Sequence, residues 1–197
     1  MTEFGTTVEQ GQGLIYEDLL PLQWRESGVE ASTLDVAKLD AKNEDVLRFI
    51  EVLDEHPSES VVEHASINQE LARVEVKFDL LLSLVTQLLG VYFPLPTPIR
   101  ARLTPSGVHW ISSEAINPGS HGVVEIYLSN RCPRPLVFLG RVENVEQEGQ
   151  GFRVAFQFSE LSEPIRERLE KLIFRHHRRS VALARRRAID DPNTPLC

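Results

Sequence analysis

The chain has 197 residues, of which 42% are hydrophobic, and its formal net charge at neutral pH is −8. This apolar fraction is sufficient for a globular core and excludes an intrinsically disordered chain. Residues 1–98 hold 6 Lys and Arg against 18 Asp and Glu, whereas residues 99–197 hold 15 against 11. The acidic half is expected to repel nucleic acids and anionic membranes. The charge distribution therefore predicts two unlike parts.

Several kinds of site and location are not expected from the sequence. No apolar run reaches the roughly 18 residues of a membrane-spanning helix, and residues 1–4 lack the basic and apolar character of a signal peptide. We therefore expect a cytoplasmic protein without membrane insertion. Cys132 and Cys197 lack the spacing of a zinc site, so we expect reduced thiols and no metal.

Residues 1–40 are predicted to form a loosely ordered N-terminal arm. The segment mixes Gly, Thr, Gln and acidic residues with one apolar patch, which comprises Leu14, Ile15, Leu19, Leu20, Leu22 and Trp24. We expect this patch to pack on the body of the protein, because an exposed Trp with several Leu would form an adhesive surface.

Residues 41–93 are predicted to be helical, with helices at about 43–56 and 60–90. Apolar residues recur three and four positions apart in both segments, and Pro57 separates them. Ser60 and Glu63 have the spacing of a capping box at the start of the second helix. The sequence thus indicates one short and one long helix.

The second helix carries a heptad seam that predicts oligomerisation. Leu at a positions with Ile or Val at d positions disfavours two-stranded packing, so we expect a multi-helix bundle or coiled coil, with a homotetramer favoured. The alternative is that the helix packs inside its own chain, against residues 43–56 and the following domain. The seam comprises His64, Ile67, Leu71, Val74, Phe78, Leu81, Val85 and Leu88.

Residues 94–187 are predicted to form a small antiparallel β-barrel of five to six strands with a C-terminal helix. Short runs rich in Val, Ile, Phe and Tyr are separated by Gly, Pro, Ser or Asn. A helix is predicted from about Ser162, and residues 188–197 are expected to form a flexible tail. The fold class is therefore α+β. The predicted strands span 99–104, 108–112, 123–128, 136–145 and 152–158.

The order of these parts resembles the PilZ domain, a bacterial receptor module for cyclic di-GMP. The resemblance covers residues 98 to about 187, and the helices ahead of the barrel are similar to those of atypical, tetrameric PilZ proteins. It rests on the turn Leu103-Thr104-Pro105-Ser106-Gly107, the strand ending Tyr127-Leu128, the segments 135–142 and 152–158, and the helix 161–174.

The resemblance implies a ligand site, and the sequence departs from it. Typical members bind the dinucleotide through an RxxxR stretch before the barrel and a D/N-x-S-x-x-G turn, where arginines contact phosphate and stack on guanine. Here residues 91–98 contain no basic residue, and Arg100 and Arg102 are separated by a single residue. Arg102 replaces the Asp or Asn, Thr104 replaces the Ser, and Gly107 matches. Gly107 is also explained as a turn residue with positive φ.

The basic end of the C-terminal helix offers two further interpretations. His176 and His177 are adjacent and point about 100° apart on a helix, which favours a solvated helical end over a shared metal. The basic run lacks interleaved aromatic residues, so we do not expect nucleic acid as the partner. It comprises Arg175, Arg178, Arg179, Arg185, Arg186 and Arg187.

The leading functional hypothesis is a non-enzymatic oligomeric signalling adaptor that uses no cofactor and binds an unknown protein partner. No nucleophile triad, paired-carboxylate, Walker or HExxH motif occurs. The alternative is a cyclic di-GMP receptor that uses Arg100, Arg102, Thr104 and Gly107 as a non-standard site. Nucleic-acid binding by the basic helix is a third, less favoured possibility.

Overall fold

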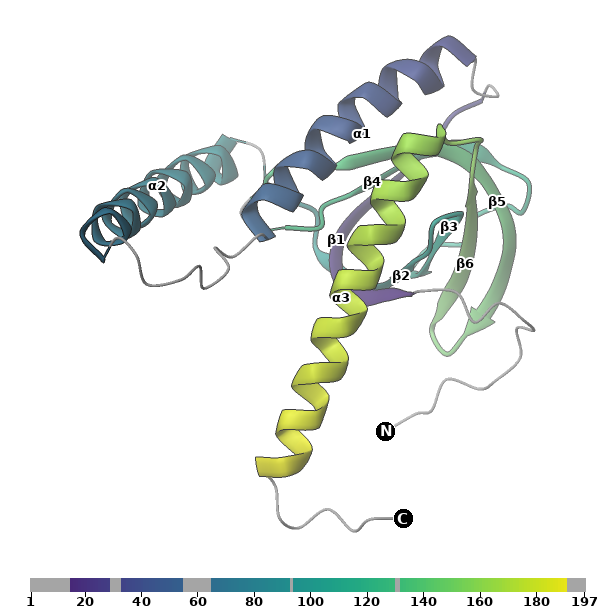
Figure 1. The fold of residues 1–197 in the computed structure, drawn as a ribbon. Coiled ribbons are helices and arrows are strands. Elements are labelled where there is room, and N and C mark those ends of the chain that lie inside the picture. Colours follow the sequence, from purple (N-terminus) through teal and green to yellow (C-terminus); the bar gives the residue numbers. More distant parts are fainter. Residues whose placement is uncertain (1–14, 29–32, 55–64, 93, 130–131, 191–197) are drawn as a thin grey trace.

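The computed structural model describes residues 15–28, 33–54, 65–92, 94–129 and 132–190. These residues form an antiparallel β-barrel with three helices (Figure 1), which confirms the α+β class and the predicted barrel. In chain order the elements are β1 (Tyr16–Glu26), α1 (Thr33–Asp54), α2 (Ala65–Tyr92), β2 (Pro98–Leu103), β3 (Gly107–Ser112), β4 (His121–Ile126), β5 (Leu136–Glu148), β6 (Gly151–Phe158) and α3 (Glu163–Asp190).

The barrel contains a strand from the segment that was expected to be a loose arm. β1 pairs with β2 along Tyr16–Pro21 and with β4 along Leu22–Glu26, which closes the barrel in the order β1-β2-β3-β6-β5-β4. The prediction of a loosely ordered arm over residues 1–40 is therefore wrong for residues 16–26. Its apolar patch does reach the core, because Leu20 and Leu22 are buried and Trp24 packs against the core.

The other five strands agree with the sequence patterns to within three residues at each end. Their inward residues form one core with the buried side chains of α1 and α3. Aromatic rings fill its centre, where Trp24 meets Phe156 edge-on with ring centroids 5.3 Å apart and Phe138 stacks on Phe158 at 4.1 Å. The barrel unit therefore spans β1 and residues 98–190 rather than residues 94–187 alone.

Helix α1 begins at Thr33, ten residues before the predicted start near residue 43. An apolar stripe does continue upstream of that point, but Asn43 occupies the position where the next apolar residue was expected. Asn43 is only 1% exposed, so this face of the helix is buried at Asn43 although the residue is polar. This single polar residue explains why the first half of the helix was missed.

Asn43 joins α1 to the barrel through both ends of its side-chain amide. Its Nδ2 donates to the carbonyl oxygen of Val137 at 2.8 Å, and its Oδ1 accepts from the backbone N–H of Val137 at 2.8 Å. β6 ends at Phe158 opposite Gly140, so β5 extends past its neighbour at this end. The amide satisfies backbone groups there that β6 does not reach, as buried polar groups require.

A charged cluster joins α1 to α3. Arg168 lies 2.6 Å from Glu51 and 3.8 Å from Glu44, and Arg175, two turns further along α3, lies 3.7 Å from Glu51. Together with Asn43, these contacts fix α1 and α3 against the barrel (Figure 1). The predicted tail over residues 188–197 begins too early, because α3 continues to Asp190.

Helix α2 occupies most of the predicted range 60–90 and lies apart from the barrel (Figure 1). It passes through Gly90 and ends at Tyr92, two residues before Pro94. The capping box expected at Ser60 and Glu63 lies outside the described residues. In the part of the chain that the structure describes, α2 makes no extensive contact with α1, α3 or the strands.

Asn43→Ala is expected to destabilise the fold by about 1–3 kcal/mol, because it leaves the partly buried N–H and C=O of Val137 without these hydrogen bonds. Chemical denaturation monitored by circular dichroism measures the loss. Asn144→Ala, at an exposed position on β5, is the matched control and should change the free energy of unfolding by less than about 0.5 kcal/mol. Equal effects of the two changes would show that the amide does not anchor α1.

Candidate functional site

The turn between β2 and β3 contains the residues that the PilZ resemblance assigns to ligand binding. The backbone N–H of Thr104 donates to the carbonyl of Gly107 at 2.9 Å. The hydroxyl of Thr104 accepts from the N–H of Gly107 at 3.0 Å and donates to its carbonyl at 3.1 Å. The Thr104 hydroxyl therefore closes the turn.

Gly107 is required by close packing and not by a left-handed backbone. Among the described glycines, positive φ angles occur at Gly119 and Gly149. The expectation of a positive φ at Gly107 is therefore wrong. A Cβ atom at this position would lie 2.4 Å from the carbonyl oxygen of Phe156 on β6, which no real side chain tolerates. Only glycine lets β3 approach β6 here, whether or not a ligand is present.

Arg100 and Arg102 lie on the outer face of β2, as the strand spacing predicts, because Ala101 and Leu103 between and after them are buried. The Nε of Arg102 donates to Glu17 of β1 at 2.9 Å. This contact matches their pairing in the β1–β2 ladder. The guanidinium that replaces the family's Asp or Asn is therefore already neutralised by an acidic neighbour.

A groove of about 600 Å³ runs between these two arginines and the second half of α3. Glu17 and Asp18 of β1 line the same groove, so its two guanidiniums face two carboxylates. A diphosphate ligand would have to overcome this acidic lining. The structure thus brings Arg100 and Arg102 together, but in a surrounding of mixed charge.

The position of β1 determines which segment directly precedes the barrel, where typical PilZ domains carry their RxxxR stretch. Residues 91–98 precede β2, whereas the first strand of the barrel is β1. The segment that directly precedes the barrel is therefore residues 1–15, which contains no Arg or Lys. Residues 91–98 therefore do not precede the first strand, and residues 1–15, which do, also lack the arginine pair.

His109 on β3 pairs with Arg102 across the strands and adds no positive charge at neutral pH. Burial lowers its pKa below the ordinary value of 6.5, and the charge of Arg102 lowers this pKa further. Glu143 acts in the opposite direction and Arg153 in the same direction, with smaller effects. The imidazole is therefore neutral near pH 7 and cannot replace a missing arginine.

The basic end of α3 is held partly against the barrel. The ring of His176 stacks on Tyr16 with centroids 3.6 Å apart, and its Nε2 lies 3.7 Å from Asp18. The expectation of a solvated helical end is therefore wrong for His176, although His177 is exposed. Arg178 lies over the ring of Phe174 at 5.8 Å. No group of three or more His, Cys, Asp or Glu with metal-binding geometry occurs in the described parts of the chain.

The heptad seam of α2 faces solvent in the single chain. Six of its residues are each between 51% and 61% exposed: Leu71, Val74, Phe78, Leu81, Val85 and Leu88. Ile67 belongs to α2, but its side chain is not among those described, and His64 lies outside the described residues. A continuous apolar surface of this kind on one helix is typical of an interaction site.

A family model described as "Atypical PilZ domain, cyclic di-GMP receptor" matches residues 46–186. The chain belongs to the atypical PilZ domain family. A structure from Xanthomonas campestris, described as a pathogenic protein with a new tetrameric PilZ domain self-assembled via an unusual helical bundle, is similar with a TM-score of 0.67. Sequence identity to it is 24%, over 88% of this chain and 93% of that chain.

The PilZ domain with c-di-GMP of YcgR from Escherichia coli has a TM-score of 0.36 and 17% identity, over 45% of this chain and 79% of that one. Curated protein sequences provide no match to this PilZ chain. None of the helices described here is long and apolar enough to cross a membrane.

We expect His109 to make the PilZ barrel less stable as the pH falls below 6.5. Its pKa is lower in the folded state, so the unfolded chain binds the proton first and gains stability relative to the fold. His109→Gln should therefore flatten the fall in melting temperature between about pH 8 and about pH 5. His177→Gln, at an exposed position on α3, is the control. Equal pH profiles for the wild type and His109→Gln would refute this role.

Proposed function

We propose that this atypical PilZ protein is a non-enzymatic oligomeric signalling adaptor whose cyclic di-GMP site is degenerate. The ion pair between Arg102 and Glu17 is the observation that carries this proposal. It neutralises the residue that stands where the family has Asp or Asn. The hydroxyl of Thr104 is committed to its own turn, and residues 1–15 supply no arginine.

Oligomerisation through α2 supplies the other half of the proposal. The helix carries an exposed apolar seam, and apolar area removed from water on association would stabilise a bundle at about 25 cal/mol per Å². The Xanthomonas campestris protein is described as a tetramer that assembles through a helical bundle. We infer a homotetramer of the same kind. Several barrels on one bundle would raise the avidity for a protein partner without strong single contacts.

Calorimetric titration of the wild-type protein with cyclic di-GMP is expected to give no binding heat, because the groove offers two guanidiniums that face two carboxylates. The alternative function, a receptor that uses a non-standard arginine site, is favoured by the common outward face of Arg100 and Arg102. Binding that is lost in Arg102→Ala but retained in Arg134→Ala would support this receptor and rule out the degenerate site.

The assembly is tested by placing two charges on the seam. Leu71→Asp with Leu81→Asp is expected to convert tetramers into smaller species in light scattering, because carboxylates would be buried among apolar side chains. Val76→Asp with Leu80→Asp is the matched control, since these residues are similarly exposed on α2 but lie outside the seam. This control variant should remain tetrameric. A monomeric wild type would refute the proposal outright.

A further inference from the structure

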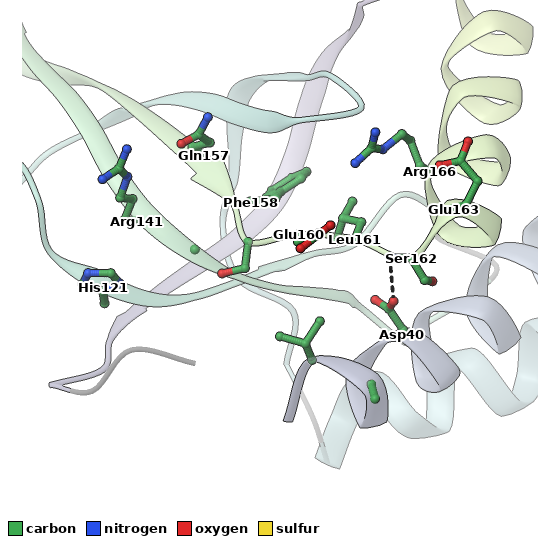
Figure 2. A pocket seen from close by; sticks show the side chains of 14 residues that line it. Asp40, His121, Arg141, Gln157, Phe158, Glu160, Leu161, Ser162, Glu163 and Arg166 are labelled. Carbon is green, nitrogen blue, oxygen red and sulfur yellow. Dashed lines mark hydrogen bonds between the residues drawn. The ribbon is translucent and has the colours of Figure 1, made fainter. Parts of the chain in front are cut away.

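A groove of about 890 Å³ lies where α1, the β5–β6 pair and the start of α3 meet (Figure 2). The guanidiniums of Arg141 and Arg166 border it, together with the carboxylates of Asp40, Glu160 and Glu163. The groove beside β2 described above likewise places two guanidiniums opposite two carboxylates. Neither groove therefore has an excess of positive charge.

The second half of α3 differs from both grooves, because its own charges are of one sign. From Arg175 to Arg187 the chain has six Arg and two His, and no Asp or Glu. Figure 1 shows this part of the helix running past the barrel toward the C-terminus. It is thus the most basic segment of a chain whose net charge is −8.

Three carboxylates of neighbouring elements lie near the barrel end of this segment. Glu51 of α1 is 3.7 Å from Arg175, and Asp18 of β1 is 3.7 Å from His176. Glu17 lines the groove beside the two histidines but is itself paired with an arginine of β2. With all three counted, six guanidiniums face three carboxylates, so an excess of positive charge remains.

One stripe along this helix alternates between apolar and basic residues. Its members are four, three and four positions apart, so they share one side of the helix over roughly 16 Å. This side is nearly opposite to the side that α3 buries against the barrel. Phe174 is 45% exposed, Val181 is 37% exposed, and Arg178 is exposed as well. The stripe comprises Phe174, Arg178, Val181 and Arg185.

The packing of α1 shows how α3 binds an acidic helix. Glu44 and Glu51 are seven residues apart on α1, and Arg168 and Arg175 are seven residues apart on α3. Ion pairs join the two helices at distances from 2.6 to 3.8 Å. Phe174 directly precedes Arg175, so the stripe begins about 100° around the helix from the side that α1 contacts. The stripe is therefore not covered by α1.

We propose that the stripe on α3 is the docking site for an acidic amphipathic helix of a partner protein. Apolar side chains of that helix pack on Phe174 and Val181, and its carboxylates pair with Arg178 and Arg185. The guanidinium of Arg178 already lies over the ring of Phe174, 5.8 Å from its centroid, which reduces the side-chain entropy lost on binding. The proposal rests on the adaptor function proposed above and names the surface through which the adaptor acts.

The alternation in the stripe favours a helix over nucleic acid. A phosphate backbone would pair with the arginines but would leave Phe174 and Val181 in water. Exposed ion pairs alone contribute at most about 1 kcal/mol each, so the apolar contacts are needed for affinity. An amphipathic helix supplies both kinds of contact at the same spacing.

The probe is a display library of helical peptides, randomised on one face and selected on the full-length protein. Selected peptides should combine apolar residues seven positions apart with Asp or Glu between them. Labelled synthetic copies should bind at least about tenfold more weakly to Arg178→Glu and to Val181→Asp. The matched controls are Arg166→Glu and Val52→Asp, which place the same changes at exposed positions outside the stripe and should leave the affinity unchanged.

The proposal is overturned if no peptide is selected, if selected peptides lack acidic residues, or if Arg178→Glu and Val181→Asp bind them as tightly as the wild type. Displacement of the peptide by a DNA duplex at physiological salt would also overturn it, because the basic helix would then be a nucleic-acid site. Light scattering and dinucleotide calorimetry test the adaptor separately. A tetramer that binds neither dinucleotide nor peptide rejects only this surface, whereas a protein that binds both rejects the degenerate site and retains the surface.

Discussion

The pairing of β1 with both β2 and β4 is the constraint on which the rest of the structure depends. Without β1, the strands β2 and β4 would be unpaired edge strands and the barrel would not close. β1 and β2 are separated in sequence by residues 27–97, yet β2 begins opposite Pro21, so this long segment leaves the barrel and returns to it at neighbouring positions. The entropy of closing such a loop grows only slowly with its length. The barrel can therefore carry two helices between adjacent strands at modest cost.

The two helices between β1 and β2 differ in how they contact the barrel. α1 is fixed to the barrel by the amide of Asn43 and to α3 by the ion pair of Glu51 with Arg168. α2 has no comparable anchor among the described residues and presents its apolar seam to solvent. One helix thus belongs to the body of the PilZ domain, while the other is available for contacts between copies of the chain. This division agrees with the proposed role as an assembled adaptor.

The turn to which the PilZ resemblance assigns nucleotide binding is held by contacts within the barrel. Thr104 closes it and Gly107 permits the approach of β6, and both roles concern the barrel alone. Arg102, in contrast, is compensated by Glu17 on the neighbouring strand. Arg141 and Arg166, which form no ion pair with a described residue, border a different groove.

Local patterns in the sequence determined the five strands after residue 98, the existence and seam of α2, and the start of α3. The strands and α3 each bury one face, so their apolar residues recur with the period of their own backbone, and the apolar residues of α2 recur at heptad spacing although they are exposed in the single chain. β1 was missed because it does not alternate: residues 17–19 are all exposed and residues 20–22 are all buried, and it contains Pro21. The first half of α1 is not apparent from the sequence because the polar Asn43 interrupts its apolar stripe. The side chain of Asn43 is instead bonded to backbone groups of β5, which is distant in the sequence.

Only the tertiary structure decided the closure of the barrel by β1, the pairing of Arg102 with Glu17 and the groove beside Arg141 and Arg166. Arg102 and Glu17 lie 85 residues apart in the chain. Contacts between such distant residues leave no periodic trace in either segment. The physical reason is that periodicity reports which side of an element is buried, whereas the identity of the neighbour depends on how all the elements pack together.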